Sequence, residues 1–207
     1  MIIFAAMDLS TPADCTKAWF ESDPAFHALY PPAIRQMARR HWTPLKVARL
    51  AAAFLRTSAS DKILDIGSGA GKFCLTAAFQ YPDTQFFGIE QRPWLVEEAN
   101  GARRRLGLTN VHFQAANLTE TDLRPFTHFY FYNSFYENLA TAEKIDQDLP
   151  CSLELFDRYS YHLYKHLRRC PAGTRLVTYH SLETEIPRDF HLVRTEINDY
   201  LKCWIKV

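Results

Sequence analysis

The chain has 207 residues, and its 24 Lys and Arg residues offset 23 Asp and Glu residues to give a formal net charge of +1. This balance gives no global signal for a polyanion or a charged surface, so we expect neither nucleic acid nor a membrane as a partner. Five scattered cysteines without a Cys-x-x-Cys pair argue against a zinc site or a disulfide framework and favour a cytoplasmic protein.

The chain is expected to divide into a helical cap at residues 1–60 and a main domain at residues 61–207. The apolar start Met1–Met7 lacks basic residues and is too short for a signal peptide or a membrane span. A polar break at residues 58–61 separates the predicted cap from the first predicted strand.

Three helices are predicted within the cap. Pro24 opens the first, and residues 33–41 carry apolar side chains on one face of the second. Thr43 is expected to cap the third helix, with Pro44 at its first position. An apolar stripe then follows along residues 47–55 and predicts that this helix packs on a core.

From residue 61 short apolar strands alternate with helices, which indicates an α/β fold with a mostly parallel sheet and right-handed crossovers. The strands are expected at 62–67, 84–89, 111–115, 128–133 and 174–180, and the helices at 71–81, 93–106 and 152–169. Two extended runs at 190–197 and 200–207 are joined by Asn198-Asp199 and predict a C-terminal antiparallel hairpin.

A glycine-rich turn, Asp-x-Gly-x-Gly-x-Gly at residues 65–71, follows the first predicted strand. Glycines at alternate positions remove the Cβ atoms that would keep a ligand away from the backbone. A phosphate-binding P-loop does not fit, because Ile66 and Phe73 stand at two of its required positions. The Gly-x-Gly-x-x-Gly turn of dinucleotide folds does not fit either, because Lys72 replaces its third glycine.

The acidic residues near this turn favour S-adenosylmethionine as the ligand. Asp65 would repel a pyrophosphate, whereas it attracts the α-ammonium of a cofactor that carries no phosphate. Glu90 ends the second predicted strand, and its two oxygens can accept hydrogen bonds from both hydroxyls of a ribose. A tight turn without a ligand is the alternative.

The segment from Lys62 to Ser181 resembles a class I (Rossmann-like) S-adenosylmethionine-dependent methyltransferase. Residues 64–72 (Leu-Asp-Ile-Gly-Ser-Gly-Ala-Gly-Lys) carry this resemblance, and with residues 129–135 (Phe-Tyr-Phe-Tyr-Asn-Ser-Phe) they also resemble the non-SET, Dot-one-type protein lysine methyltransferases. The resemblance implies a seven-stranded Rossmann-like methyltransferase sheet and methyl transfer by in-line displacement. It implies cofactor contacts from these residues: Thr43, Asp65, Gly67, Ser68, Gly69, Gly71, Glu90, Gln91, Asn117, Leu118 and Asn133.

The reaction centre is expected at the end of the fourth predicted strand. Asn133 would orient the cofactor or a nucleophilic nitrogen, and Phe135 and Tyr136 would shape an apolar slot around the methyl group. The resemblance makes a protein lysine the leading acceptor, with Glu137 as a candidate proton relay. A small-molecule N- or O-methyltransferase and a non-catalytic cofactor-binding module are the alternatives. An Asn/Asp-Pro-Pro-Tyr tetrad, which would favour nucleic acid, does not follow this strand.

A long acidic connection and a pair of histidines are two further features of the sequence. The connection at residues 137–150 is long for a compact domain and is either a substrate lid or a solvated loop. His162 and His166 have a spacing that zinc ligands use, but Leu163 replaces the Glu of the metalloprotease motif, so no metal is expected.

Overall fold

A computed structural model describes residues 16–139, 144–181 and 183–207, and the apolar start Met1–Met7 lies outside these residues. It contains one sheet with the strands β1 (Lys62–Ile66), β2 (Gln85–Glu90), β3 (Val111–Ala115), β4 (His128–Tyr132), β5 (Arg175–Tyr179), β6 (Phe190–Glu196) and β7 (Leu201–Lys206). The order across the sheet is β3-β2-β1-β4-β5-β7-β6. Strands β1 to β5 pair in parallel, while β7 is antiparallel to β5 and β6. The predicted parallel sheet with a terminal hairpin is therefore confirmed.

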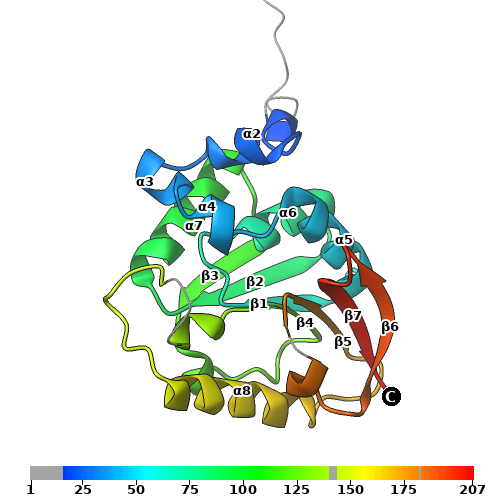
Figure 1. Cartoon of the computed structure of the whole chain (residues 1–207). Helices are drawn as coiled ribbons and strands as arrows, with labels where there is room; N and C mark the ends of the chain where they lie inside the picture. Colours follow the sequence, from blue (N-terminus) through cyan, green and yellow to red (C-terminus); the bar gives the residue numbers. More distant parts are fainter. Residues whose placement is uncertain (1–15, 140–143, 182) are drawn as a thin grey trace, which may run out of the picture.

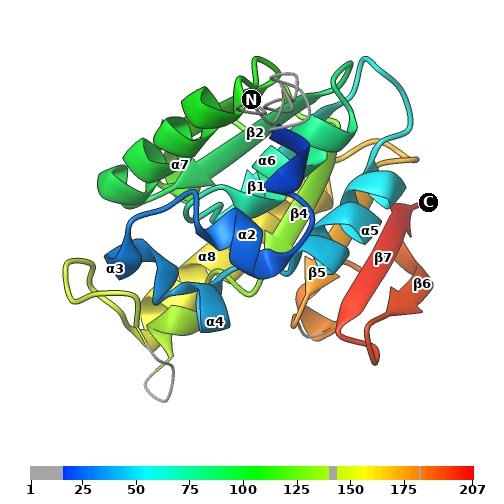
Figure 2. The ribbon, with the colours of Figure 1, turned by 90° about the horizontal axis from the view of Figure 1, so that it is seen from above.

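Helices cover both faces of this sheet (Figure 1). They are α2 (Asp23–His27), α3 (Pro32–Arg35), α4 (Ala38–His41), α5 (Leu45–Leu55), α6 (Lys72–Gln80), α7 (Pro93–Leu106) and α8 (Leu153–Leu167). Helices α5, α6 and α7 lie on one face and α8 lies on the other, while α2 to α4 extend over the first layer (Figures 1 and 2). No helix in the described parts of the chain has both the length and the apolar character needed to cross a membrane.

The central strands are buried on both faces, which explains their continuous apolar sequences. Successive side chains of a strand point to opposite faces. Ile63 and Tyr130 accordingly join the core under α5 to α7, whereas Leu64, Phe129 and Phe131 join the core over α8. The two cores fix the register of the strands, because a slip by one residue would exchange the faces.

Residues 33–41 form two short helices instead of the single predicted one. The N–H of Met37 donates to the carbonyl of Ile34 at 3.1 Å, a contact three residues apart that tightens the chain between α3 and α4. Met37 then contributes to the wall of a cavity. A domain boundary at residue 60 stays a prediction; helix α5, before this point, shares one core with α6.

The start of α5 also differs from the prediction, because Thr43 does not cap it. Pro44 precedes the first helical residue and offers no side-chain cap. Asp23 of α2 instead accepts the N–H of Leu45 at 3.0 Å. The Thr43 hydroxyl lies 3.0 Å from the hydroxyl of Tyr130 on β4. A carboxylate distant in sequence thus replaces the local cap and ties α2 to α5.

Candidate functional site

A cavity of about 350 Å³ opens where β1, β2 and β4 end. Ligands of parallel α/β sheets bind at such carboxyl ends, and the volume suits a small organic ligand. The predicted site residues that line this cavity are Gly67, Gly69, Glu90, Gln91, Leu118, Asn133, Phe135 and Tyr136. Four chain segments far apart in sequence therefore contribute to one site.

The glycine-rich turn forms the floor of the cavity at the end of β1. The N–H groups of Gly67 and Ser68 both donate to the carbonyl of Ile89 at 2.9 Å, which fastens the turn to β2. Gly67 has a φ of +75°, and a Cβ there would lie 2.3 Å from Oγ of Ser134. A Cβ at Gly69, with φ +53°, would meet no atom within 4 Å. The turn therefore packs tightly at Gly67 and leaves space beside Gly69.

Glu90 projects from the end of β2 into the wall of the cavity and is only 6% exposed. One carboxylate oxygen accepts the N–H of Gly69 at 3.1 Å, and the other accepts the N–H of Arg92 at 3.0 Å. Burial raises the pKa of this carboxyl, although the contacts from Arg92 and Gly69 favour its charged form. Each oxygen keeps a second lone pair, so the carboxylate can still accept hydrogen bonds from two hydroxyls.

A second, smaller cavity of about 30 Å³ adjoins the first, and Thr43, Asp65 and Ser68 line it. Gly67 and Trp42 line both cavities. Asp65 is 3% exposed, and burial raises the pKa of its carboxyl well above the usual range. The Cys74 thiol is a weak hydrogen-bond donor to this carboxyl, with Sγ 3.7 Å from Oδ2. A buried carboxylate with so weak a donor would gain from a cationic ligand group.

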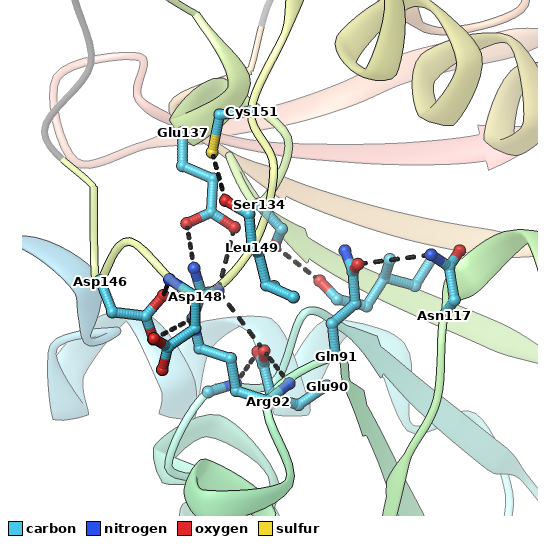
Figure 3. Close-up of polar contacts among 12 residues, drawn as sticks. Glu90, Gln91, Arg92, Asn117, Ser134, Glu137, Asp146, Asp148, Leu149 and Cys151 are labelled. Atoms are coloured by element: carbon cyan, nitrogen blue, oxygen red, sulfur yellow. Dashed lines mark hydrogen bonds and ion pairs between the residues drawn. The ribbon is translucent and has the colours of Figure 1, made fainter.

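Two predicted site residues line neither cavity. Gly71, with φ +86°, precedes the first residue of α6, and a Cβ there would lie 2.5 Å from the ring of Phe113. Asn117 accepts the N–H and the hydroxyl of Thr119 with its amide oxygen, each at 2.9 Å. Its amide nitrogen donates to Gln91 (Figure 3) and also to the hydroxyl of Tyr159. Neither residue therefore lines the cavity wall, and the amide oxygen of Asn117, a predicted cofactor contact, is engaged within the protein.

The predicted reaction centre lies in the cavity wall after β4. Asn133 adopts the left-handed region with φ +48°. Its amide oxygen is buried and has no hydrogen-bond partner in the described structure. Phe135 packs on Phe131 with a ring-centroid distance of 4.7 Å, so one face belongs to the core while the residue also lines the cavity. The arrangement combines an unsatisfied acceptor with an apolar wall.

Arg92 is a site residue that the sequence analysis missed. It is 3% exposed and donates to Asp146 at 2.8 Å and to both oxygens of Glu137 at 3.1 and 2.9 Å (Figure 3). Burial lowers the pKa of the guanidinium, but these carboxylates outweigh it and raise the pKa. Glu137 is thus bound to a cation, which argues against its predicted role as a proton relay.

The connection at residues 137–150, expected to be either a substrate lid or a solvated loop, contacts Arg92 through Glu137 and Asp146. Glu137 and Ile145 line the cavity together with Arg92. Residues 140–143 lie outside the described structure. Arg92 lies two residues after Glu90, but no pattern in the sequence indicates that its partners follow β4. That this segment acts as a lid stays a prediction.

Aromatic side chains form a further part of the wall that the sequence analysis did not assign. His41, Trp42, Tyr132 and His180 line the cavity. Tyr132 and Tyr179 are partners across β4 and β5, and each is followed by a residue with positive φ, Asn133 or His180. A tyrosine followed by a polar residue at the end of β4 and of β5 is the sequence pattern that could have indicated this part of the wall.

Residues 57–146 match the family model of a methyltransferase domain. The chain has a class I methyltransferase fold. An RNA methyltransferase from Salinibacter ruber, solved with S-adenosyl-L-homocysteine, aligns with a TM-score of 0.56 and 20% identity over 80% of this chain and 92% of its own. An O-methyltransferase from Thermotoga maritima aligns with a TM-score of 0.55 and 16% identity over 86% of this chain and 72% of its own. The predicted fold is confirmed by these matches.

Curated relatives match a part of this chain. The tRNA (guanine-N(7)-)-methyltransferase of Synechococcus sp. (strain JA-3-3Ab) is 56% identical over 55 residues, which is 27% of this chain and 23% of that protein. The enzyme of the same name from Nostoc sp. (strain PCC 7120) is 37% identical over 84 residues, 41% of this chain and 38% of that protein. The alignments therefore span about a quarter to two fifths of the length of these relatives.

These names correct one expectation from the sequence. Relatives that act on tRNA overturn the expectation that nucleic acid is not a partner. That expectation used the net charge of the whole chain and the absence of an Asn/Asp-Pro-Pro-Tyr tetrad, and neither describes a local contact surface. The names also give no support to a protein lysine as acceptor, and the Dot-one-type resemblance is unconfirmed. The cytoplasmic location stays a prediction.

Proposed function

We propose that this chain is an S-adenosylmethionine-dependent methyltransferase whose acceptor is a guanine base in RNA. The observation that carries the proposal is the cavity at the ends of β1, β2 and β4, where an acidic strand end faces an open glycine turn. The base is proposed from the function that the curated relatives are named for and from the aromatic wall of the cavity.

The residues of the cavity fit the chemical groups of this cofactor. Glu90 offers acceptor positions to the two ribose hydroxyls, and the space beside Gly69 admits a ligand against the backbone. Asp65, in the adjoining cavity, offers a buried carboxyl whose charged form the α-ammonium would stabilise. The guanidinium of Arg92 is already bound to carboxylates, which disfavours a phosphate-bearing ligand.

The chemistry needs positioning more than acid–base catalysis. When bound, the cofactor supplies a methyl group on a sulfonium, which is a good leaving group. The protein then has to hold the nucleophile in line with the methyl group, and such positioning lowers the barrier by several kcal/mol. Phe135 and Tyr136 would exclude water from this region of the cavity.

A guanine nitrogen suits a site in which the carboxylate of Glu137 is engaged by Arg92. N7 of guanine is a hydrogen-bond acceptor with a free lone pair, so it can attack without first losing a proton. Glu137 is bound to Arg92 and is not needed as a base in this reaction. The unpartnered amide oxygen of Asn133 can accept an N–H of the base and orient it. An acceptor lysine, in contrast, would need to be deprotonated.

Methyl transfer to RNA tests the proposal directly. The purified chain is incubated with methyl-labelled S-adenosylmethionine and bulk bacterial tRNA that lacks 7-methylguanosine, and the RNA is digested to nucleosides for mass spectrometry. We expect the label in 7-methylguanosine. Label in another nucleoside would move the acceptor atom, and label only in protein or small molecules of a cell extract would overturn the RNA acceptor. Failure to bind the cofactor in calorimetry would overturn the whole proposal.

Asn133→Gly tests the role of the amide without disturbing the backbone. Glycine adopts the positive φ of this position readily, so the variant is expected to fold. We expect turnover to fall by about tenfold to a hundredfold, as for the loss of one hydrogen bond in a buried site, while the Kd of S-adenosylhomocysteine changes less than threefold. A larger effect on the Kd than on turnover would make Asn133 a cofactor-binding residue instead.

A further inference from the structure

We propose that the rings of His180 and Tyr200 form a stacking surface for the planar base of the methyl acceptor. The proposal rests on the proposed function, because it names where the base to be methylated lies. His180 follows β5 and lines the cavity, and Tyr200 ends the turn between β6 and β7. Neither residue is among those expected to act in the site from the sequence.

The two rings are the outer part of a row of aromatic side chains. The ring centroids of Tyr132 and Tyr179 lie 4.7 Å apart, and those of Tyr179 and His180 lie 4.3 Å apart. His180 and Tyr200 stack with centroids 4.3 Å apart and an angle of 26° between their planes. Exposure rises along this row from 7% at Tyr179 to 51% at Tyr200. The row therefore leads from the core, past the cavity, to solvent.

The backbone that carries these rings adopts an unfavourable conformation. In the described residues, the side-chain-bearing positions with positive φ are Asn133, His180, Ile197, Asn198 and Asp199. Three of them form the turn directly before Tyr200, and Ile197 is β-branched, a residue type for which positive φ is an outlier. Such conformations persist only where the surrounding structure imposes them, and they concentrate at functional sites.

A backbone contact joins the two strained segments. The N–H of His180 donates to the carbonyl of Tyr200 at 3.0 Å. This contact sets the position of one ring relative to the other, so the ring pair is built into the ends of β5 and β7. The positive φ values at His180 and in the turn before Tyr200 thus place the rings of these two residues together beside the cavity.

The chemistry of this face selects a class of acceptor. Every nucleobase has a π-face and stacks on aromatic side chains without sequence-specific contacts. His180 and Asn133 line the same cavity, so a base stacked on the ring pair can reach the unpartnered amide oxygen with an N–H at its edge. A planar heterocycle with an N–H donor meets both conditions, whereas a flexible lysine side chain offers no ring to stack.

Nucleotide binding without turnover tests the surface. Calorimetry measures the affinity of guanosine 5′-monophosphate, and of ribose 5-phosphate as the probe without a base, for the full chain saturated with S-adenosylhomocysteine. We expect the intact protein to bind the nucleotide and to bind ribose 5-phosphate much more weakly. Tyr200→Ala and His180→Asn are each expected to weaken nucleotide binding about tenfold, the scale of one base–aromatic stack. Tyr200→Phe keeps the ring and is expected to retain binding.

Matched variants separate stacking from loss of the fold. Asparagine tolerates the left-handed conformation of position 180, so His180→Asn removes the ring without adding strain. Tyr161, 66% exposed on α8 and absent from the cavity wall, provides the control Tyr161→Ala, which is expected to bind as the intact protein does. The Kd of S-adenosylhomocysteine is expected to stay within twofold in all variants.

Two binding results would overturn the stacking surface, and both are distinct from failure of the proposed reaction. The first is equal nucleotide affinity in the intact protein, Tyr200→Ala and His180→Asn. The second is no nucleotide binding to the intact protein. If the intact protein methylates tRNA while both variants keep the acceptor KM, the surface is refuted and the reaction stands. If nucleotide binding depends on both rings but no methyl group enters RNA, the surface stands and the RNA reaction is refuted.

Discussion

Gly69 and Glu90 both line the cavity and contact each other. The N–H of Gly69 donates to Glu90, while the side-chain position of Gly69 is open space. The other two glycines of the turn have steric reasons for lacking a side chain, because a Cβ at Gly67 or Gly71 would come within 2.5 Å of Ser134 or Phe113. Gly69 is therefore the position where a substitution reports on the ligand and not on packing.

Gly69→Ala is expected to weaken cofactor binding at least tenfold, because its methyl group occupies space left for the ligand. The matched control is Gly107→Ala, at the end of α7, where φ is +66° and a Cβ also meets nothing within 4 Å. Both variants are expected to lose about 1–2 kcal/mol of stability for the left-handed backbone. Calorimetry with S-adenosylhomocysteine and thermal unfolding measure the two effects. Equal Kd values in both variants would place the ligand elsewhere.

Glu90→Gln is expected to weaken cofactor binding by about 1.5–3 kcal/mol, the scale of a hydrogen bond to a charged group. The control Glu120→Gln changes an exposed carboxylate outside the cavity and is expected to have no effect. Burial raises the pKa of Glu90, so its carboxylate gains a proton at a higher pH than an ordinary glutamate does. Affinity in the intact protein is therefore expected to fall on acidification above the usual glutamate range, and this dependence is expected to shrink in Glu90→Gln. A pH profile shared by both proteins would contradict the role of Glu90.

The connection after β4 is the element whose position the sequence leaves open. Arg92, directly before α7, binds Glu137 at the start of this connection and Asp146 near its end (Figure 3). The guanidinium is buried, whereas the carboxylates keep exposures of 15% and 19%. The connection is thereby held against the cavity wall by charge and not by an apolar face.

Arg92→Met is expected to cost about 3 kcal/mol of stability, the lower end of the range for breaking a buried ion pair, because both carboxylates stay partly hydrated. Amide hydrogen exchange in the described residues 137–139 and 144–150 is expected to accelerate, and the cofactor Kd to rise. Arg124→Met is the control; it breaks the pair of Arg124 with Asp122, in which Arg124 is 86% exposed, and is expected to leave stability unchanged because an exposed ion pair contributes little. Unchanged exchange in Arg92→Met would show that other contacts hold the connection.

Strand and helix positions in the main domain follow closely from the sequence, and the exceptions have a physical cause. The strands β1 to β5 begin and end within one residue of the predicted limits. Their apolar runs, turn glycines and helix periodicity are local signals. Helix α5 departs from the prediction because its first N–H is satisfied by Asp23, a residue 22 positions away.

The buried side chain of Lys72 joins the N-terminal helix α2 to helix α6, which packs on the sheet. Lys72, at the start of α6, is 4% exposed and pairs with Asp23 and with His27 of α2. Tyr30 adds a hydrogen bond of 2.7 Å to the carbonyl of Ala70 in the glycine-rich turn. The N-terminal helices therefore contact both the glycine-rich turn and the start of α6, so their position affects the shape of the turn.

Asp23→Ala is expected to lower the free energy of unfolding by about 2–4 kcal/mol, because it removes a helix cap and leaves the buried Lys72 without its carboxylate. Burial raises the pKa of Asp23, but Lys72 and the N–H of Leu45 outweigh it and lower the pKa. This contribution to stability is present above the ordinary aspartate pKa and disappears as the pH falls through the lowered value. Asp83→Ala, which breaks the exposed pair with Arg56, is the control and is expected to cost less than about 1 kcal/mol. Denaturant unfolding at neutral and acidic pH measures the free energy of unfolding of both variants. Equal decreases in Asp23→Ala and Asp83→Ala would show that Asp23 does not hold the N-terminal helices in place.

The proposal about the methyl acceptor depends on residues that the whole fold brings together. A net charge of +1 sums side chains over the entire surface. It therefore carries no information about the row of rings beside the cavity, which combines residues from β4, β5 and the turn before β7. Net charge led to the wrong expectation about nucleic acid because a sum over the entire surface does not describe a local contact surface.

The parallel sheet, its terminal hairpin, the glycine-rich turn and the acidic residue at the end of β2 were all predictable from the amino-acid sequence. Each of these depends on residues close together in the chain, where apolar periodicity and backbone freedom act directly. Three contacts became visible only in the folded chain: Arg92 holds the connection after β4, Asp23 caps α5, and His180 stacks on Tyr200. These contacts join residues from separate elements, and their partners are chosen by how the elements pack and not by their spacing along the chain.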